Sequence, residues 1–92
     1  MATILVVDDN ATNRKLLLTL LRLEGHEVVE AADGRDGLEA ARAQRPQLII
    51  SDILMPSMDG YEFVRQLRAD PELQRTAVVF YTAHYLEREA RK

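Results

Sequence analysis

The sequence predicts an α/β fold in which a parallel sheet lies between two layers of helices. Short continuous apolar runs alternate with segments of helical periodicity, and this alternation repeats along the chain. Strands that are apolar on both faces are typical of a parallel sheet covered on both sides. Right-handed crossovers between such strands give a three-layer α/β/α sandwich.

The first strand is expected at residues 4–7, an apolar run that ends at Asp8 and Asp9. Asn10 is a suitable N-cap for the helix that follows. Leucines then recur three and four residues apart until Gly25 ends the helix.

The second unit begins with a short strand around Val28 and Val29. A turn is expected at Asp33 and Gly34, and an alanine-rich helix follows it. This helix ends before Pro46, because proline disfavours helical backbone in the residue that precedes it.

The third apolar run covers residues 48–50 and leads through Ser51 to Asp52. A loop over residues 55–60 separates it from an amphipathic helix that ends at residues 70–71. The predicted element order so far is therefore strand, helix, strand, helix, strand and helix.

A fourth strand is expected at residues 77–81, and it ends at Thr82. Leu86 and Ala90, four residues apart, predict a further helix that reaches Lys92. The chain of 92 residues contains no linker or low-complexity tract, so a single domain is expected.

Charge and composition narrow the classes of function. The net charge is −3, and the positive side chains are scattered, so nothing indicates a nucleic-acid-binding face or a membrane-binding patch. No cysteine is present, which excludes disulfides and thiolate metal sites. No apolar run approaches the ~18 residues of a membrane span, so a cytoplasmic protein is expected.

The predicted strands end in residues that can carry chemistry. Asp8 and Asp9 follow the first strand, Asp52 the third and Thr82 the fourth. Function collects at the carboxyl ends of strands in open parallel sheets. If the first and third strands are neighbours, three carboxylates converge there and favour a bound cation. Oxygen ligands suit Mg²⁺ rather than Zn²⁺.

A structural interpretation competes with this metal site. An aspartate after a strand is more often a turn former or a helix N-cap than a ligand. However, Asp8 and Asp9 form a doublet where one cap would suffice, and Asp52 follows a buried run where a carboxylate is costly. The residues alone leave both interpretations open.

At these positions the sequence resembles the receiver domains of two-component response regulators. The resemblance covers residues 1–92 as one receiver domain without the family's fifth strand and last helix. It implies a flavodoxin-like sheet with strand order 2-1-3-4. The matching segments are residues 6–10 (VVDDN), 31–34 (AADG), 51–60 (SDILMPSMDG) and 82–83 (TA).

The resemblance implies a role for each matching residue. Asp52 would be the nucleophile that accepts a phosphoryl group from a phosphohistidine of a sensor histidine kinase or phosphotransfer protein. Asp9, Asp52 and the backbone carbonyl of Leu54 would ligate Mg²⁺, with Asp8 acting mainly through a water on the metal. Thr82 would donate its hydroxyl to a phosphoryl oxygen, since phosphoryl transfer needs positioning and neutralised charge.

Other positions are assigned more narrowly. Leu54 and His84 correspond to the positions that tune dephosphorylation in the family, although His84 also fits a solvated residue that opens the last helix. Lys92 lies within an apparent helix and is not followed by proline, so it is not assigned the family's phosphate-binding role. His26 is expected to be an exposed loop residue.

A signalling switch is therefore expected, rather than an enzyme that turns over a separate substrate. A haloacid-dehalogenase-type phosphatase is a remote alternative. That family has Asp-x-Asp after its first strand, whereas Asp8 and Asp9 are adjacent here. A nucleotide-binding domain is disfavoured, because acids in the first loop repel phosphate. A catalytically impaired receiver fragment or engineered piece is the remaining alternative.

Without a fifth strand, the edge of residues 77–81 is expected to be unpaired and the face of residues 4–7 partly uncovered. Unpaired edges recruit other chains. We therefore expect that the natural protein continues past Lys92, or that the chain forms a homodimer or an element-swapped oligomer.

Overall fold

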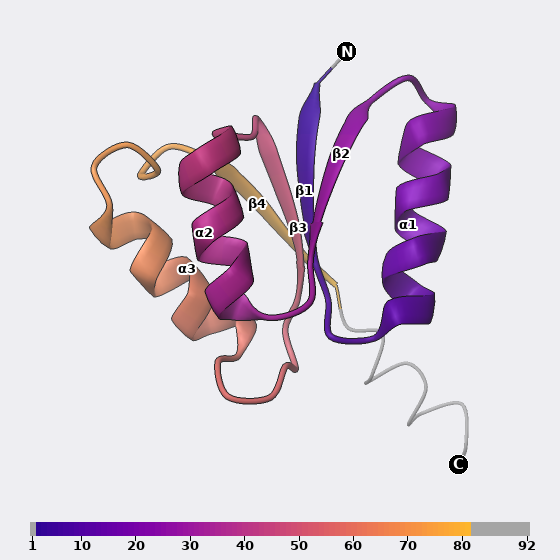
Figure 1. Ribbon diagram of the computed structural model, residues 1–92. Helices are drawn as coiled ribbons and strands as arrows, with labels where there is room; N and C mark the ends of the chain where they lie inside the picture. The colour runs from indigo at the N-terminus through magenta and orange to yellow at the C-terminus, as the bar shows by residue number, and fades with distance from the viewer. Residues whose placement is uncertain (1, 82–92) are drawn as a thin grey trace.

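A computed structural model of the chain describes residues 2–81, in which strands and helices alternate (Figure 1). The elements are β1 (Thr3–Val7), α1 (Ala11–Leu23), β2 (Glu27–Ala31), α2 (Gly34–Gln44), β3 (Leu48–Asp52), α3 (Gly60–Ala69) and β4 (Ala77–Tyr81). The helix expected after Thr82 lies outside the described residues. Each of the other predicted elements is present, which confirms the alternating order.

The four strands form one parallel sheet in the order β2-β1-β3-β4. Helix α1 covers one face of this sheet, and α2 and α3 cover the other (Figure 1). The predicted three-layer architecture and the 2-1-3-4 order are both confirmed. Within residues 2–81, β4 pairs with β3 and forms one edge of the sheet.

Each helix begins at a side chain that caps its first turn. The Asn10 side chain accepts a hydrogen bond from the backbone N–H of Asn13 at 3.0 Å, as predicted. Asp33 caps α2 in the same way, and Asp59 caps α3. The expected turn at Asp33 and Gly34 is therefore the start of α2 itself, because the aspartate side chain replaces the missing helical acceptor.

The end of α1 is closed by Gly25, as predicted. Gly25 has a φ of 87°, which glycine adopts without steric cost. Its N–H donates to the carbonyl of Arg22 at 3.0 Å, and the N–H of His26 donates to that of Leu21 at 3.2 Å. The prediction of an exposed His26 was wrong, because this half-buried ring accepts a hydrogen bond from the N–H of Ala2 through Nδ1.

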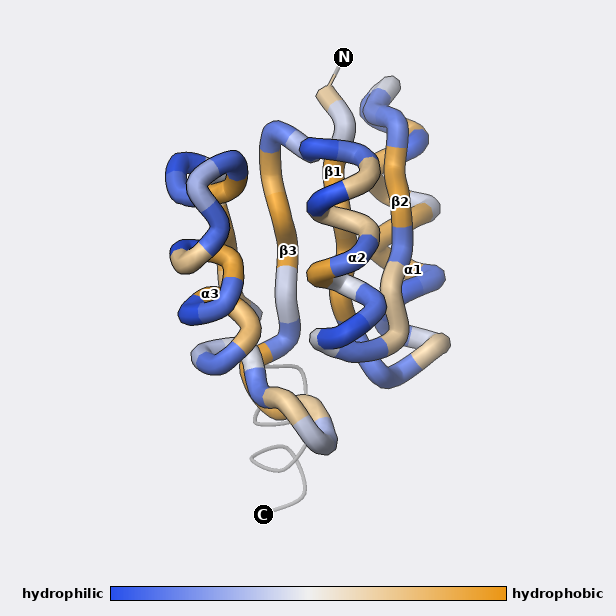
Figure 2. The backbone as a smooth tube through the Cα atoms, turned by 60° about the vertical axis from the view of Figure 1, so that its left-hand side comes forward, coloured by the Kyte–Doolittle hydropathy of each residue, from blue (hydrophilic) through white to orange (hydrophobic). Residues whose placement is uncertain are grey.

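The main hydrophobic core lies between the sheet and the pair α2 and α3. Figure 2 shows the hydrophobic stretches of the strands facing helices whose outer residues are hydrophilic. Phe63 and Leu67 of α3 are completely buried in this core. The other buried members of the cluster are Leu5, Val7, Ala31, Leu38, Ala41, Ile49, Met55 and Leu73.

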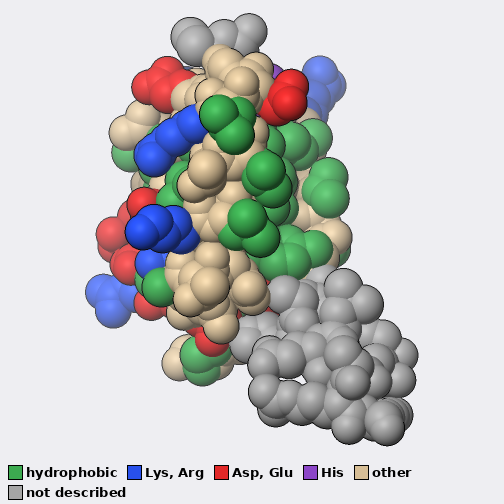
Figure 3. Space-filling model, turned by 90° about the vertical axis from the view of Figure 1, so that its right-hand side faces the viewer, with side chains coloured by type: hydrophobic (Ala, Val, Ile, Leu, Met, Phe, Trp, Pro, Cys, Tyr) green, Lys and Arg blue, Asp and Glu red, His purple; other side chains and the backbone are tan. Residues whose placement is uncertain are grey.

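The opposite face is covered less completely by α1. Leu18 is the buried residue of this helix, whereas Leu16, Leu20 and Leu23 are 60%, 51% and 78% exposed. Figure 3 shows hydrophobic side chains gathered along one side of α1. The expectation that residues 4–7 are partly uncovered was nevertheless wrong, because all four are at most 3% exposed and contact helices on both faces.

None of the helices within residues 2–81 is long and apolar enough to span a membrane.

Candidate metal centre at the carboxyl end of the sheet

Three carboxylates meet where β1 and β3 end. Asp8 and Asp9 directly follow β1, and Asp52 is the last residue of β3. These strands are neighbours, with Val7 paired to Ser51, so Asp8 and Asp52 come next in register. One oxygen from each of the three carboxylates lies within 4.8 Å of the others. The predicted convergence of the aspartates is confirmed.

The cluster is largely withdrawn from solvent. Asp8 and Asp52 are completely buried, and Asp9 is half-buried. Because burial and neighbouring like charges both disfavour ionised carboxylates, such a cluster gains from a cation. Three carboxylate oxygens form the hard donor set that suits Mg²⁺, and they leave coordination positions for water or phosphate. The chemistry of these residues therefore fits a magnesium ion.

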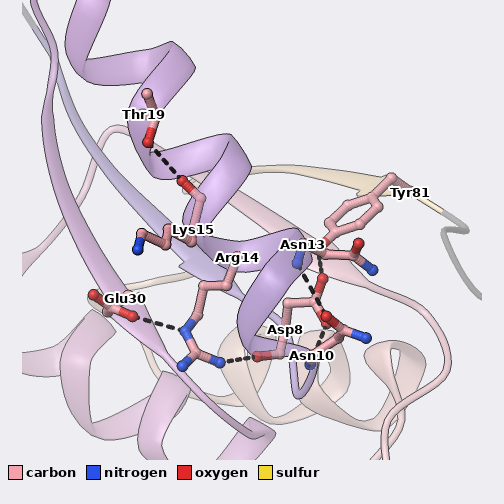
Figure 4. A network of polar contacts seen from close by, with 8 residues as sticks. All are labelled: Asp8, Asn10, Asn13, Arg14, Lys15, Thr19, Glu30 and Tyr81. Carbon is pink, nitrogen blue, oxygen red and sulfur yellow. Dashed lines mark hydrogen bonds and ion pairs between the residues drawn. The ribbon is translucent and has the colours of Figure 1, made fainter.

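Hydrogen bonds engage both oxygens of the Asp8 carboxylate (Figure 4). Oδ1 accepts from the backbone N–H of Asn10 at 2.8 Å. Oδ2 accepts from the hydroxyl of Tyr81, at the end of β4. Donors from the loop before α1 and from the end of β4 therefore hold this buried carboxylate in place.

The backbone of Asp8 is held as firmly as its side chain. Its N–H donates to the carbonyl of Ala31 at 3.1 Å, which extends the pairing of β1 with β2. Its carbonyl accepts from the guanidinium of Arg14 at 2.7 Å, and the same guanidinium donates to Glu30 at 2.7 Å (Figure 4). Helix α1 and strand β2 thus fix the chain at the start of the acidic doublet.

Asp52 is positioned by the turn that follows β3. The N–H of Leu54 donates to Oδ1 of Asp52 at 3.2 Å. The N–H of Gly60 donates to the carbonyl of Ile53 at 2.8 Å, which brings the start of α3 against the end of β3. A Cβ at Gly60 would lie 2.8 Å from both the carbonyl oxygen of Asp52 and a ring carbon of Phe80. Glycine is therefore required for this close approach.

Tyr81 is the residue of this site that the sequence analysis missed, because residue 81 was considered only as the end of a strand. A signal was available, since Tyr81 is the last residue of β4 and pairs in register with Asp52. Its burial, its hydrogen bond to Asp8 and the negative charges of the three aspartates raise the pKa of Tyr81 far above its usual value. The phenol therefore remains a hydrogen-bond donor.

The remaining predicted site residues divide into two groups. Leu54 lies directly beside Asp52, and its side chain is 44% exposed. Thr82 and His84 lie outside the described residues. The structure therefore brings together the acidic part of the predicted site.

Comparison with known proteins shows similarity to receiver domains. The family model "response regulator receiver domain" matches residues 4–92. Protein PilH of Pseudomonas aeruginosa is 39% identical over 82 residues, which cover 89% of this chain and 68% of that protein. The response regulator DivK of Brucella anthropi is 36% identical over 81 residues, or 88% of this chain and 66% of that protein.

Solved structures agree with this match. The chemotaxis protein CheY4 of Vibrio cholerae superimposes with a TM-score of 0.84 at 36% identity, covering 99% of this chain and 78% of that one. The receiver domain of sensor histidine kinase PA1611 of Pseudomonas aeruginosa superimposes with a TM-score of 0.85 at 32% identity, covering 99% of this chain and 75% of that one. That structure is described with a magnesium ion in its active site cleft.

The chain belongs to the response regulator receiver domain family. Its parallel sheet has the flavodoxin-like order of the receivers, and members of this family are signalling switches of two-component systems. The chain spans about two thirds of PilH, but only 31% of the transcriptional regulatory protein AfsQ1 of Streptomyces coelicolor.

Proposed function

We propose that this chain is a phosphoacceptor whose nucleophile is Asp52. The observation that carries the proposal is the convergence of Asp8, Asp9 and Asp52 within 4.8 Å at the carboxyl ends of two adjacent parallel strands. Asp52 belongs to a strand, whereas the other two aspartates lie in the following loop. A rigid strand end suits a nucleophile, because phosphoryl transfer depends mainly on positioning.

In the proposed reaction, one carboxylate oxygen of Asp52 attacks the phosphorus of a phosphohistidine on the partner. The new O–P bond forms as the N–P bond breaks, and the imidazole leaves with the electron pair and takes up a proton. Asp9, Asp52 and the backbone carbonyl of Leu54 would hold Mg²⁺, assisted by Asp8. When bound, the ion neutralises charge on the phosphoryl oxygens. Thr82 would donate its hydroxyl to the transferred group.

The partner that we propose is a sensor histidine kinase or a phosphotransfer protein, as for receiver domains in general. Phosphorylation would then change a partner-binding or dimerisation surface. Leu54 and His84 are proposed to tune the lifetime of the phosphoryl group. The exposed side chain of Leu54, next to Asp52, supports this for the first of the two.

A location in the cytoplasm, without direct contact to nucleic acid or membrane, also belongs to the proposal. Self-association is proposed through a second copy of the chain. Its support is the exposed leucine side chains of α1, together with the edge position of β4 within the described part of the sheet.

Acetyl phosphate and Mg²⁺ provide a direct test with the purified chain. Intact-mass spectrometry should detect one base-labile phosphoryl group on the wild type and none on Asp52→Asn. Asp59→Asn is the matched control, because it makes the same change in a residue that caps α3 outside the cluster. Undiminished labelling of Asp52→Asn would move the nucleophile elsewhere. Absence of label on a folded wild type would favour a catalytically impaired receiver.

A further inference from the structure

Tyr81 lies across the acidic cluster rather than beside it. It ends β4 and pairs with Asp52 of β3, while β3 separates β4 from β1. Its hydroxyl nevertheless donates to Oδ2 of Asp8, which follows β1 (Figure 4). The phenol therefore spans the end of the central strand and connects the two sides of the cluster.

This contact supplies one of the two hydrogen bonds that the carboxylate of Asp8 accepts. Asp8 is completely buried, so solvent does not provide its hydrogen bonds. The backbone N–H of Asn10 serves Oδ1, and Tyr81 serves Oδ2. A hydrogen bond to an ionised acceptor is stronger than one between neutral groups. The phenol thus stabilises the negative charge that a cation would otherwise stabilise.

The ring of Tyr81 has space beside it. It lines an apolar groove of about 280 Å³ on the α1 side of the sheet. The other lining residues are Asn13, Leu16, Leu17 and Ile50. An unfilled groove next to the ring allows the phenol to shift without forcing the main core apart. The hydroxyl can therefore leave Asp8 by a side-chain movement.

We propose that Tyr81 is a positioning residue that holds Asp8 when no cation is bound and competes with Mg²⁺ for the same carboxylate. The inference deepens the proposed function and rests on its metal site. Removal of the hydroxyl leaves Oδ2 of Asp8 available to the ion and withdraws the donor that otherwise stabilises its negative charge. Tyr81→Phe therefore binds Mg²⁺ about tenfold more tightly than the wild type.

Calorimetric titration of the 92-residue chain with Mg²⁺ tests this competition. Tyr81→Phe retains the ring and removes only the hydroxyl, and circular dichroism checks that it folds. Tyr61→Phe is the matched control, because Tyr61 is 63% exposed and its ring packs on Phe80. The dissociation constant should fall in Tyr81→Phe and stay unchanged in Tyr61→Phe.

A spectroscopic measurement on the same samples provides a second criterion. Mg²⁺ should produce a tyrosine absorption difference in the wild type and in Tyr61→Phe that is lost in Tyr81→Phe, because the ion displaces the hydrogen bond that the Tyr81 hydroxyl donates to Asp8. Two results would overturn the role of Tyr81 while leaving the metal site intact. In the first, the wild type binds Mg²⁺ and Tyr81→Phe has an equal or larger dissociation constant. In the second, the wild type binds Mg²⁺ without the absorption difference. No Mg²⁺ binding by either protein would overturn the proposed metal site and this inference together.

Discussion

The two faces of the sheet differ in how they are packed. The face toward α2 and α3 carries a contiguous core, in which Phe63 and Leu67 are completely buried. The face toward α1 is covered by a helix in which Leu16, Leu20 and Leu23 are more than half exposed, and an apolar groove remains beside it. Burial of apolar surface is the main source of stability, so the first face contributes most of it.

The acidic site belongs to the less tightly packed face. Side chains alternate along a strand, so Tyr81 shares the α1 face with Val79, and Asp52 shares it with Ile50. Tyr81 and Ile50 line the groove together with α1. The two faces therefore differ in role. The face toward α2 and α3 maintains the fold, while the face toward α1 has the space that a side-chain movement requires.

The largest expected effect is a loss of stability on the well-packed face. Phe63→Ala removes a completely buried ring from the main core, which should lower the free energy of unfolding by about 3–5 kcal/mol. Leu20→Ala, on the half-exposed side of α1, is the control and should cost under about 1 kcal/mol. Urea unfolding of both variants measures the contrast. Equal losses would show that the two faces contribute alike.

A smaller loss of stability is expected at the junction between the start of α3 and the end of β3. Gly60→Ala would place a methyl group 2.8 Å from the backbone oxygen of Asp52, which is a rigid neighbour. We expect a cost of about 1–3 kcal/mol and weaker Mg²⁺ binding, because the end of β3 must shift. Urea unfolding and calorimetry measure the two effects.

Gly34→Ala is the matched control, since Gly34 is likewise the first residue of a helix capped by aspartate. There the new methyl group would meet the side chain of Met58, which can move. The loss of stability should therefore be smaller, and Mg²⁺ binding should be unchanged. A greater effect at Gly34 than at Gly60 would contradict the tight junction between α3 and β3.

The cap of α1 should contribute about 1 kcal/mol. Asn10→Ala removes the acceptor for the N–H of Asn13, whereas Asn10→Ser keeps a capping oxygen. Chemical denaturation should show a loss for the first variant and almost none for the second. Similar losses of stability in both variants would mean that the Asn10 side chain does not stabilise the protein by capping α1.

The smallest change in stability is expected on the exposed side of α1. Leu20→Glu combined with Leu23→Glu should alter the free energy of unfolding by under about 0.5 kcal/mol for each residue, because both side chains are mostly in water. The same double variant should associate less than the wild type in size-exclusion chromatography with light scattering. A monomeric wild type at all concentrations would contradict the proposed self-association.

Much of this organisation could be predicted from local patterns in the sequence. Leucine spacing and Gly25 located α1, and continuous apolar runs located the strands, because buried parallel strands have no polar face. The site was predictable in part: Asp8 and Asp9 directly follow the first strand, Asp52 ends the third, and parallel strands end at the same edge. Local patterns and strand polarity therefore carried these predictions.

The contacts that were missed join residues that are distant in sequence. Tyr81 and Asp8 are 73 positions apart, and only the strand order brings them together. The half-buried state of His26 depends similarly on the N–H of Ala2 at the start of β1. Asp33 was predicted as a turn residue because a cap and a turn have the same local sequence signature.

The most direct test of the account is a Mg²⁺ titration of the isotopically labelled chain, followed through its backbone amide NMR signals. The proposed metal site predicts that the largest shifts occur at Asp8, Asp9 and residues 52–54, while amides of the main core around Phe63 change little. Asp9→Asn should abolish or strongly weaken the response. Shifts that centre on other residues, or that persist fully in Asp9→Asn, would contradict the assignment of this acidic cluster as the magnesium site.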